Sequence, residues 1–162
     1  MASFGLARTN NPISPSNQVI DSSTPWVAAS EGNLALLQTS LTKLNLPPSA
    51  ADENGYTLVH AAASYNQIAV LQHLLASGQV NVHAADNDGD SSLHYAGNVQ
   101  ACKLLVEVGG ANPQQVNGAN KTALQAKQEE LKEMMEDEDV EDDDEDLEIL
   151  KGVVAYLTSL QQ

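Results

Sequence analysis

The segment DENGYTLVHAAA, at residues 52–63, returns in altered form as DNDGDSSLHYAG, at residues 86–97. The glycine of the first segment stands 34 residues before its counterpart in the second, and the histidine does the same. Because several residue types recur at one period, the sequence predicts an array of stacked structural repeats.

The residues of one unit predict a turn, a short helix, a loop and a second helix. An Asn-Gly or Asp-Gly pair favours a tight turn, because glycine accepts positive φ without strain. Thr57 then stands where a helix N-cap is needed, and an alanine-rich helix follows. The second helix ends before Gly78, and its apolar residues form one face: Ile68, Val70, Leu71, Leu74 and Leu75.

This unit resembles an ankyrin repeat, whose pattern D-x-x-G-x-T-P-L-H-x-A-A precedes an apolar helix ending in L-L-x-x-G-A. Residues 52–78 follow the pattern, with Leu58 and Val59 where the family prefers Pro and Leu. The resemblance implies an all-α ankyrin repeat solenoid of about four helix–turn–helix repeats, degenerate at both ends. Within a domain of residues 21–162, we place the repeats at about 22–48, 53–85, 87–115 and 120–160.

The third repeat is predicted to be shortened. Ten residues separate His94 from Leu104, against 14 over the same interval of the second repeat, so roughly one helical turn is missing. Either the first helix or the inter-helix loop is shortened, and we expect the loop around Gly97, because Gly and Asn tolerate abrupt reversals. The apolar pair of this repeat would then stack behind that of the second: Leu104 and Leu105 behind Leu74 and Leu75.

The composition excludes several classes of protein. The chain of 162 residues has 22 acidic side chains against 7 Lys and Arg, a formal net charge of -15, which argues against nucleic acid and anionic membranes as partners. One cysteine excludes an intrachain disulfide, and no apolar run approaches the ~20 residues of a membrane-spanning helix. We expect residues 1–20 to be a disordered leader, and the protein to be a monomer in the cytoplasm, or in the nucleus as well.

Enzyme signatures are absent from the sequence. It contains no nucleophile elbow, zinc-protease motif, phosphate-binding loop or paired-cysteine motif. His60 and His94 occupy the family's T-x-L-H box, in which the resemblance implies a hydrogen bond to a neighbouring turn. We therefore expect a non-catalytic protein with no metal and no cofactor.

The resemblance implies that partners bind the concave surface, through the turn tips and the exposed sides of the first helices. Tyrosines there would supply contact area with a polar end, although solvation alone also favours polar turn tips. Trp26 falls on the family's histidine position in the first repeat, where it could anchor a partner or fill the junction with the second repeat. The predicted partner-binding residues are Trp26, Val27, Glu31, Asn54, Tyr56, Tyr65, Asp88, Asp90 and Tyr95.

An acidic run separates two apolar helical segments of the last repeat. Residues 136–148 hold 11 of the 22 acidic side chains, and without them the net charge would be -4. A calcium loop would need a central glycine, which the run lacks. The choice lies between a solvated loop and an electrostatic arm for a basic protein segment. The predicted loop, 136–146, contains Glu136, Asp137, Glu138, Asp139, Glu141, Asp142, Asp143, Asp144, Glu145 and Asp146.

Two functions fit these features. The first is a chaperone or escort that shields a basic client, of the ribosomal or nucleic-acid-binding type, through the concave surface and the acidic loop. The second is an adaptor or inhibitory subunit that docks on a larger enzyme or transport complex by its concave face. Salt distinguishes them, because only a basic client should bind with steep salt dependence.

Overall fold

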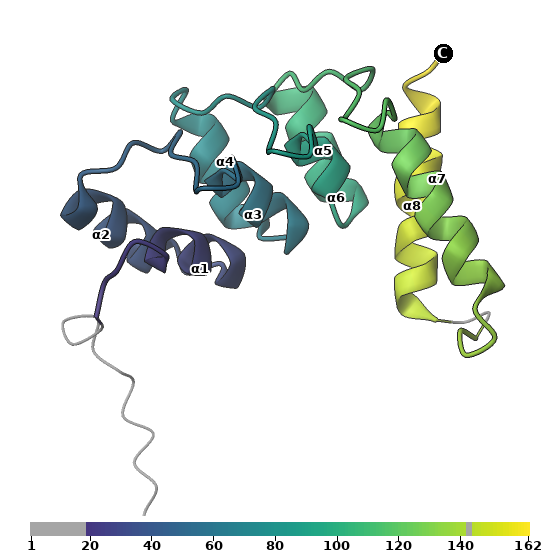
Figure 1. Ribbon diagram of the computed structural model, residues 1–162, viewed down its shortest axis with the longest axis horizontal. Helices are drawn as coiled ribbons and strands as arrows, with labels where there is room; N and C mark the ends of the chain where they lie inside the picture. Colours follow the sequence, from purple (N-terminus) through teal and green to yellow (C-terminus); the bar gives the residue numbers. More distant parts are fainter. Residues whose placement is uncertain (1–18, 142–143) are drawn as a thin grey trace, which may run out of the picture.

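The computed structural model describes residues 19–141 and 144–162, and these residues form four helix pairs stacked side by side (Figure 1). The all-α class and the solenoid architecture predicted from the sequence are confirmed. The predicted leader, residues 1–20, lies outside the described residues except for its last two positions, and so do Asp142 and Asp143 of the acidic run.

Each pair consists of a first helix and a second helix, and a hairpin turn with one antiparallel bridge leads to the next pair. Small residues dominate α3, where three consecutive alanines are buried, so neighbouring first helices approach closely. The pairs are α1 (Thr24–Glu31) with α2 (Leu34–Leu44), α3 (Leu58–Ser64) with α4 (Ile68–Ala76), α5 (Ser92–Tyr95) with α6 (Val99–Lys103) and the π-helix η2 (Leu104–Val108), and α7 (Ala123–Glu136) with α8 (Glu145–Ser159).

In the third repeat the first helix is shortened, and the prediction of a shortened loop is wrong. α5 has four residues and α3 has seven, whereas three residues link the two helices in both repeats. The helix stops because Ala96 leaves helical geometry, with φ -54° and ψ 120°. Gly97 then donates its N–H to the carbonyl oxygen of Ala63 at 3.3 Å, which holds the link against the end of α3.

The burial pattern also corrects the register of the third repeat. Leu105 is fully buried at the place that Leu74 occupies in the second repeat, whereas Leu104 is only partly buried. Leu75 is likewise only partly buried, so one leucine of each predicted pair is fully buried, Leu74 in the second repeat and Leu105 in the third. Eleven residues separate His94 from this leucine, and the deletion is therefore three residues, which matches the shortening of the first helix.

The last pair is longer than the others and extends beyond them (Figure 1). The acidic segment between its helices is shorter than the predicted loop of 136–146, because Glu136 belongs to α7 and Glu145 and Asp146 belong to α8. The side chain of Asp144 caps α8 by accepting the N–H of Asp146 at 2.9 Å. Carboxylates in a first helical turn also interact favourably with the helix dipole, which explains why α8 takes in part of the acidic run.

Candidate protein-binding surface

The hairpin tips are held by one side chain at the same place in each turn. Asp52 Oδ1 accepts the backbone N–H groups of Asn54 at 2.8 Å and Tyr56 at 2.9 Å. The equivalent Asp86 and Asn117 accept the same two bonds in the following turns. The tips are therefore ordered before any partner arrives, which reduces the entropy lost on binding.

Two histidines fasten successive repeats to one another. The N–H of Thr57 donates to His60 Nδ1 at 3.1 Å, so Nε2 carries the ring proton and donates to the carbonyl oxygen of Asp90 at 3.0 Å. His94 repeats this link to the carbonyl oxygen of Lys121. Burial lowers the pKa of His60, which maintains the neutral ring that these bonds need. The hydrogen-bonding role implied by the resemblance is confirmed.

Trp26 makes the corresponding link in the first repeat. Its indole N–H donates to the carbonyl oxygen of Tyr56 at 2.8 Å, and its ring packs against the core while remaining partly exposed. The side chain therefore closes the junction between the first two repeats and also contributes to the surface beside it.

An aromatic cluster lies next to these links. The Tyr56 and Tyr95 rings meet edge to face, with centroids 5.2 Å apart, and both lie beside His60. Tyr95 donates its hydroxyl proton to Asp86 Oδ2 at 2.6 Å. Burial, and then this hydrogen bond, raises the pKa of Tyr95. Burial opposes ionisation of Asp86, but hydrogen bonds from Tyr95 and the turn lower its pKa, so the pair is a neutral phenol beside a carboxylate at neutral pH.

Two hollows adjoin the cluster, and Asp52, Tyr56 and Tyr95 line both of them. One, of about 520 Å³, extends over the side chains of α1 and α3, and the other, of about 410 Å³, lies between two hairpin tips. At the edge of the first hollow, Tyr65 is 61% exposed and Val27 is 43% exposed. The surface thus combines aromatic faces, apolar groups and carboxylates within reach of one bound segment.

Most of the predicted partner-binding residues come together here. Two of them, Glu31 at the end of α1 and Asp90, line neither hollow, and Asp90 accepts a hydrogen bond from the side chain of Asn117 at 2.8 Å. That the remaining residues contact a partner stays a prediction. Those that line the hollows are Trp26, Val27, Asn54, Tyr56, Tyr65, Asp88 and Tyr95.

Asp52 and Asp86 line the hollows as well, and neither was predicted from the sequence as a binding residue. Each stands three residues before the glycine of its turn. An acceptor at that position, able to bond the N–H two residues on, is typical of an Asx turn. This signal identifies both aspartates as tip residues, although their proximity to the tyrosines depends on the stacking of the repeats.

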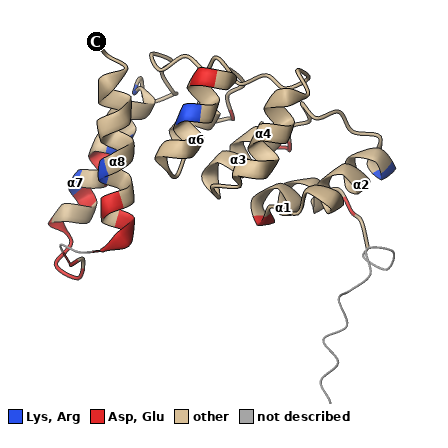
Figure 2. Cartoon of the chain, turned by 180° about the vertical axis from the view of Figure 1, so that it is seen from behind, with Lys and Arg blue, Asp and Glu red and all other residues tan. Residues whose placement is uncertain are grey.

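Negative charge is concentrated in the last repeat. Residues 119–162 contain 14 acidic residues and 4 lysines, a net charge of -10, whereas residues 1–118 contain 8 acidic and 3 basic residues, a net charge of -5. The described acids gather where α7 ends and α8 begins (Figure 2). Each lysine of the last repeat forms an ion pair within that repeat: Lys121 with Glu129, Lys127 with Glu130, Lys132 with Glu136, and Lys151 with Glu148.

A family model described as ankyrin repeats, in three copies, matches residues 26–117. The match covers more than half of the chain and takes in the first three helix pairs, while α7 and α8 lie beyond it. No curated protein matches the chain. In the described part of the chain, no helix combines the length and apolarity needed to cross a membrane, and no three His, Cys, Asp or Glu side chains cluster as metal ligands.

Proposed function

The chain belongs to the ankyrin repeat family, a family of protein–protein interaction modules that are generally non-catalytic, and we propose that it is a monomeric escort or chaperone for a basic client protein. The client would be of the ribosomal or nucleic-acid-binding type, met in the cytoplasm or the nucleus. The concave surface would hold a basic segment of the client, and the acidic last repeat would attract and shield further positive charge.

The observation that carries this proposal is the combination of tyrosines and carboxylates at the two hollows. Tyr56 and Tyr95 line one hollow together with Asp52 and Asp86, and Asp88 is exposed at the same hollow. A guanidinium group can pair with a carboxylate and also stack on an aromatic face. An ammonium group can pair with a carboxylate or lie over an aromatic face, but its geometry is less specific. The surface therefore suits arginine-rich or lysine-rich segments better than acidic or purely apolar ones.

The charge of the last repeat supports the same partner. A net charge of -10 in residues 119–162 creates a field that speeds encounter with a positive surface. This effect is screened beyond about 8 Å at physiological ionic strength. We therefore expect the acidic repeat to act mainly on the association rate, while the concave surface acts on dissociation.

The proposed function does not include catalysis. Both ring nitrogens of His60 and His94 are engaged in the links between repeats. Cys102 is buried, and burial raises its pKa to about 11, so the thiolate needed for nucleophilic attack does not form at neutral pH.

One observation favours the second candidate, an adaptor or inhibitory subunit of a larger enzyme or transport complex. A hollow of about 400 Å³ lies beside Trp26, Leu46 and Ala51, at the edge of the first repeat, and is also lined by Asp52 and Glu53. An apolar side chain of a folded partner would pack against Trp26, Leu46 and Ala51. Binding dominated by this hollow would show little dependence on salt.

The test measures binding of the full chain to a fluorescent arginine-rich peptide and to the same peptide with every Arg replaced by Gln, at two salt concentrations. We expect the Arg peptide alone to bind, and its affinity to fall steeply with salt. Asp88→Asn should weaken it about threefold or more, because it removes a carboxylate from the hollow. Glu31→Gln is the matched control, since it removes an exposed carboxylate outside both hollows. Equal binding of the two peptides would contradict the basic client and favour the adaptor.

A further inference from the structure

The short α5 leaves a notch between the end of α3 and the last helix pair. The notch has a volume of about 340 Å³. Ser64, Asn66 and the link after α5 form one side, and helical faces of α7 and α8 form the other. The residues of α7 and α8 that line the notch are Lys127, Glu130, Met134, Asp146, Ile149 and Leu150.

The notch is open because the link of the third repeat folds toward the second repeat. A Cβ atom on Gly97 would lie 2.8 Å from the Asn66 side-chain oxygen and 3.0 Å from the carbonyl oxygen of Ser64. The link is therefore packed as tightly against α3 as glycine allows. α7 has 14 residues and α5 only four, so the second half of α7 extends past the helix that precedes it in the stack.

The floor of the notch is apolar and its rim is acidic. Ile149 is 36% exposed and Met134 is partly exposed, both over the buried Leu150. Glu130 and Asp146 stand at the rim as exposed carboxylates. Met134 and Ile149 therefore give the notch a small apolar surface, against which an apolar side chain of a partner would pack.

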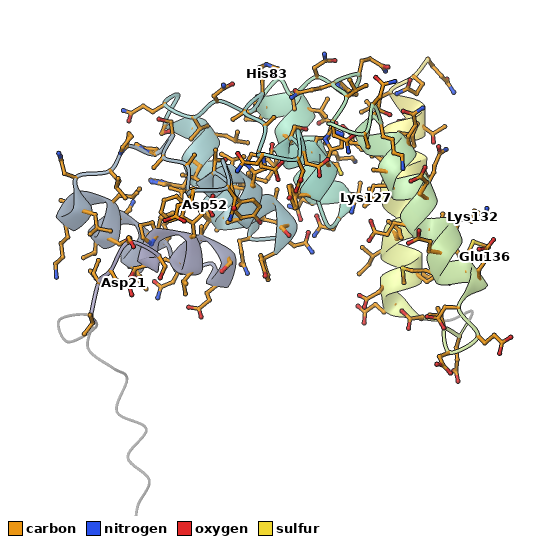
Figure 3. All side chains as sticks on the ribbon, in the orientation of Figure 1. Asp21, Asp52, His83, Lys127, Lys132 and Glu136 are labelled. Atoms are coloured by element: carbon orange, nitrogen blue, oxygen red, sulfur yellow. The ribbon has the colours of Figure 1, made fainter. Side chains whose placement is uncertain are left out.

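The lysine of the notch offsets only one of the two rim carboxylates. Lys127 extends from α7 toward the third repeat, whereas Lys132 and Glu136 lie on the other side of α7 (Figure 3). Lys127 pairs with Glu130 at 2.8 Å, and its side chain is only 12% exposed. The exposed charge at the rim is therefore negative, in a repeat whose net charge is -10.

We propose that the notch is a second docking site, occupied by a client segment in which an apolar side chain stands next to Lys or Arg. The apolar side chain would cover Met134 and Ile149, and the cation would lie between Glu130 and Asp146. The occupant is chosen by charge complementarity, because a second copy of a chain with net charge -15 would be repelled. The inference rests on the proposed function, since the occupant belongs to the basic client, but the site is separate from the tyrosine surface.

The test titrates the full chain with a fluorescent peptide of alternating Leu and Arg, and with versions in which Arg is replaced by Gln or Leu by Ser. Each notch variant has a control of the same chemistry outside the notch. Glu130→Gln is compared with Glu129→Gln, because each removes the acidic partner of a lysine of the last repeat and Glu129 does not line the notch. Ile149→Ser is compared with Met135→Ser, which replaces a residue that is 64% exposed and does not line the notch.

We expect the Leu/Arg peptide to bind more tightly than either altered version. Glu130→Gln and Ile149→Ser should each weaken it about threefold or more, and their controls should leave affinity within about twofold. Peptide addition should also shift the backbone amide resonance of Gly97. Circular dichroism melts check that each variant is folded. If Ile149→Ser does not fold, Glu130→Gln still tests the site.

Three outcomes overturn the inference. Notch variants that match their controls, while Asp88→Asn weakens binding, would eliminate the notch and leave the proposed function standing. Wild-type protein that binds none of the peptides would overturn both. A dimer in sedimentation velocity that Ile149→Ser converts to monomer would show that a second copy, and not a basic client, covers the notch.

Discussion

The second and third repeats share one turn and one histidine box, yet they differ in the length of the first helix. The turn aspartate, the N-cap hydroxyl and the histidine make the same hydrogen bonds in both. α3 nevertheless has seven residues and α5 four. The comparison shows that the hairpin and the box hold the stack together, while helix length can vary independently. Shortening one helix exposes the flank of its neighbour, which here is α7.

The largest expected effect tests the equivalence of the central leucines in the two repeats. Leu74→Ala and Leu105→Ala should each lower the free energy of unfolding by about 2–5 kcal/mol, because each leaves a cavity at a fully buried site. Leu104→Ala should cost less than half as much, since Leu104 is only partly buried. Urea denaturation measures all three, and equal losses for Leu104 and Leu105 would contradict the register given above.

The next effect concerns the link that distinguishes the third repeat. Gly97→Ala should lower the free energy of unfolding by about 1–3 kcal/mol, because the new methyl group meets Asn66 and the backbone of Ser64 at 3.0 Å or less. Gly152→Ala is the control, since its Cβ would meet only the side chain of Val99, at 3.3 Å, and alanine favours a helix interior. A neutral Gly97→Ala would mean that the link is not held against α3.

Local sequence rules predicted the parts of this fold that local interactions determine. The period, the turn and the N-cap hydroxyl are readable because each depends on residues within a few positions of one another. Asp144, followed by further acids, is also a readable helix start. The end of α5 is different, because Ala96 has a high helix propensity and the chain turns there through a contact between Gly97 and the second repeat.

The same distinction applies to the two candidate sites. The tyrosines and tip residues follow from the repeat pattern, because each repeat places them on the same side of the stack. The notch arises because α5 of the third repeat is shorter than α7 of the fourth. It also requires the link after α5 to pack against the second repeat. The sequence predicted a missing helical turn but could not place it in the first helix, and the deletion of three residues became clear only from the burial of Leu105. The surface that the short helix exposes was therefore not predictable.

A smaller effect tests the histidine link through pH. Burial lowers the pKa of His60 in the folded protein below its ordinary value of 6.5. The contribution of the neutral His60 ring to stability is therefore complete above pH 6.5 and is lost as the pH falls through the folded pKa. The free energy of unfolding should therefore decline between pH 7 and 5, by less than about 1.4 kcal/mol per pH unit, the limit for one proton. This window lies above the ordinary carboxyl pKa of 3.8.

His60→Gln should flatten this pH dependence. The amide of Gln125 already serves the same box in the fourth repeat, where it accepts the N–H of Thr122 at 2.9 Å, so glutamine can preserve the cap without a titrating group. His83→Gln is the control, because His83 is exposed. Urea denaturation at several pH values measures the slope, and an unchanged slope in His60→Gln would assign the pH dependence to another group.

The smallest effect concerns the residue that follows the N-cap of α5. Ser92 is 2% exposed, and its Oγ has no hydrogen-bond partner among the described residues. The same position holds leucine in the second repeat and alanine in the fourth. Ser92→Ala should raise the free energy of unfolding by about 0.5–1 kcal/mol, because it removes an unpaired buried hydroxyl and favours the helix. Ser91→Ala should lower it by about 1 kcal/mol, since it removes a hydroxyl that lies 2.9 Å from His94 Nδ1. Thermal and urea denaturation compare the two, and a loss of stability in Ser92→Ala would show that the hydroxyl is bonded and that the third repeat depends on a polar contact absent from the second.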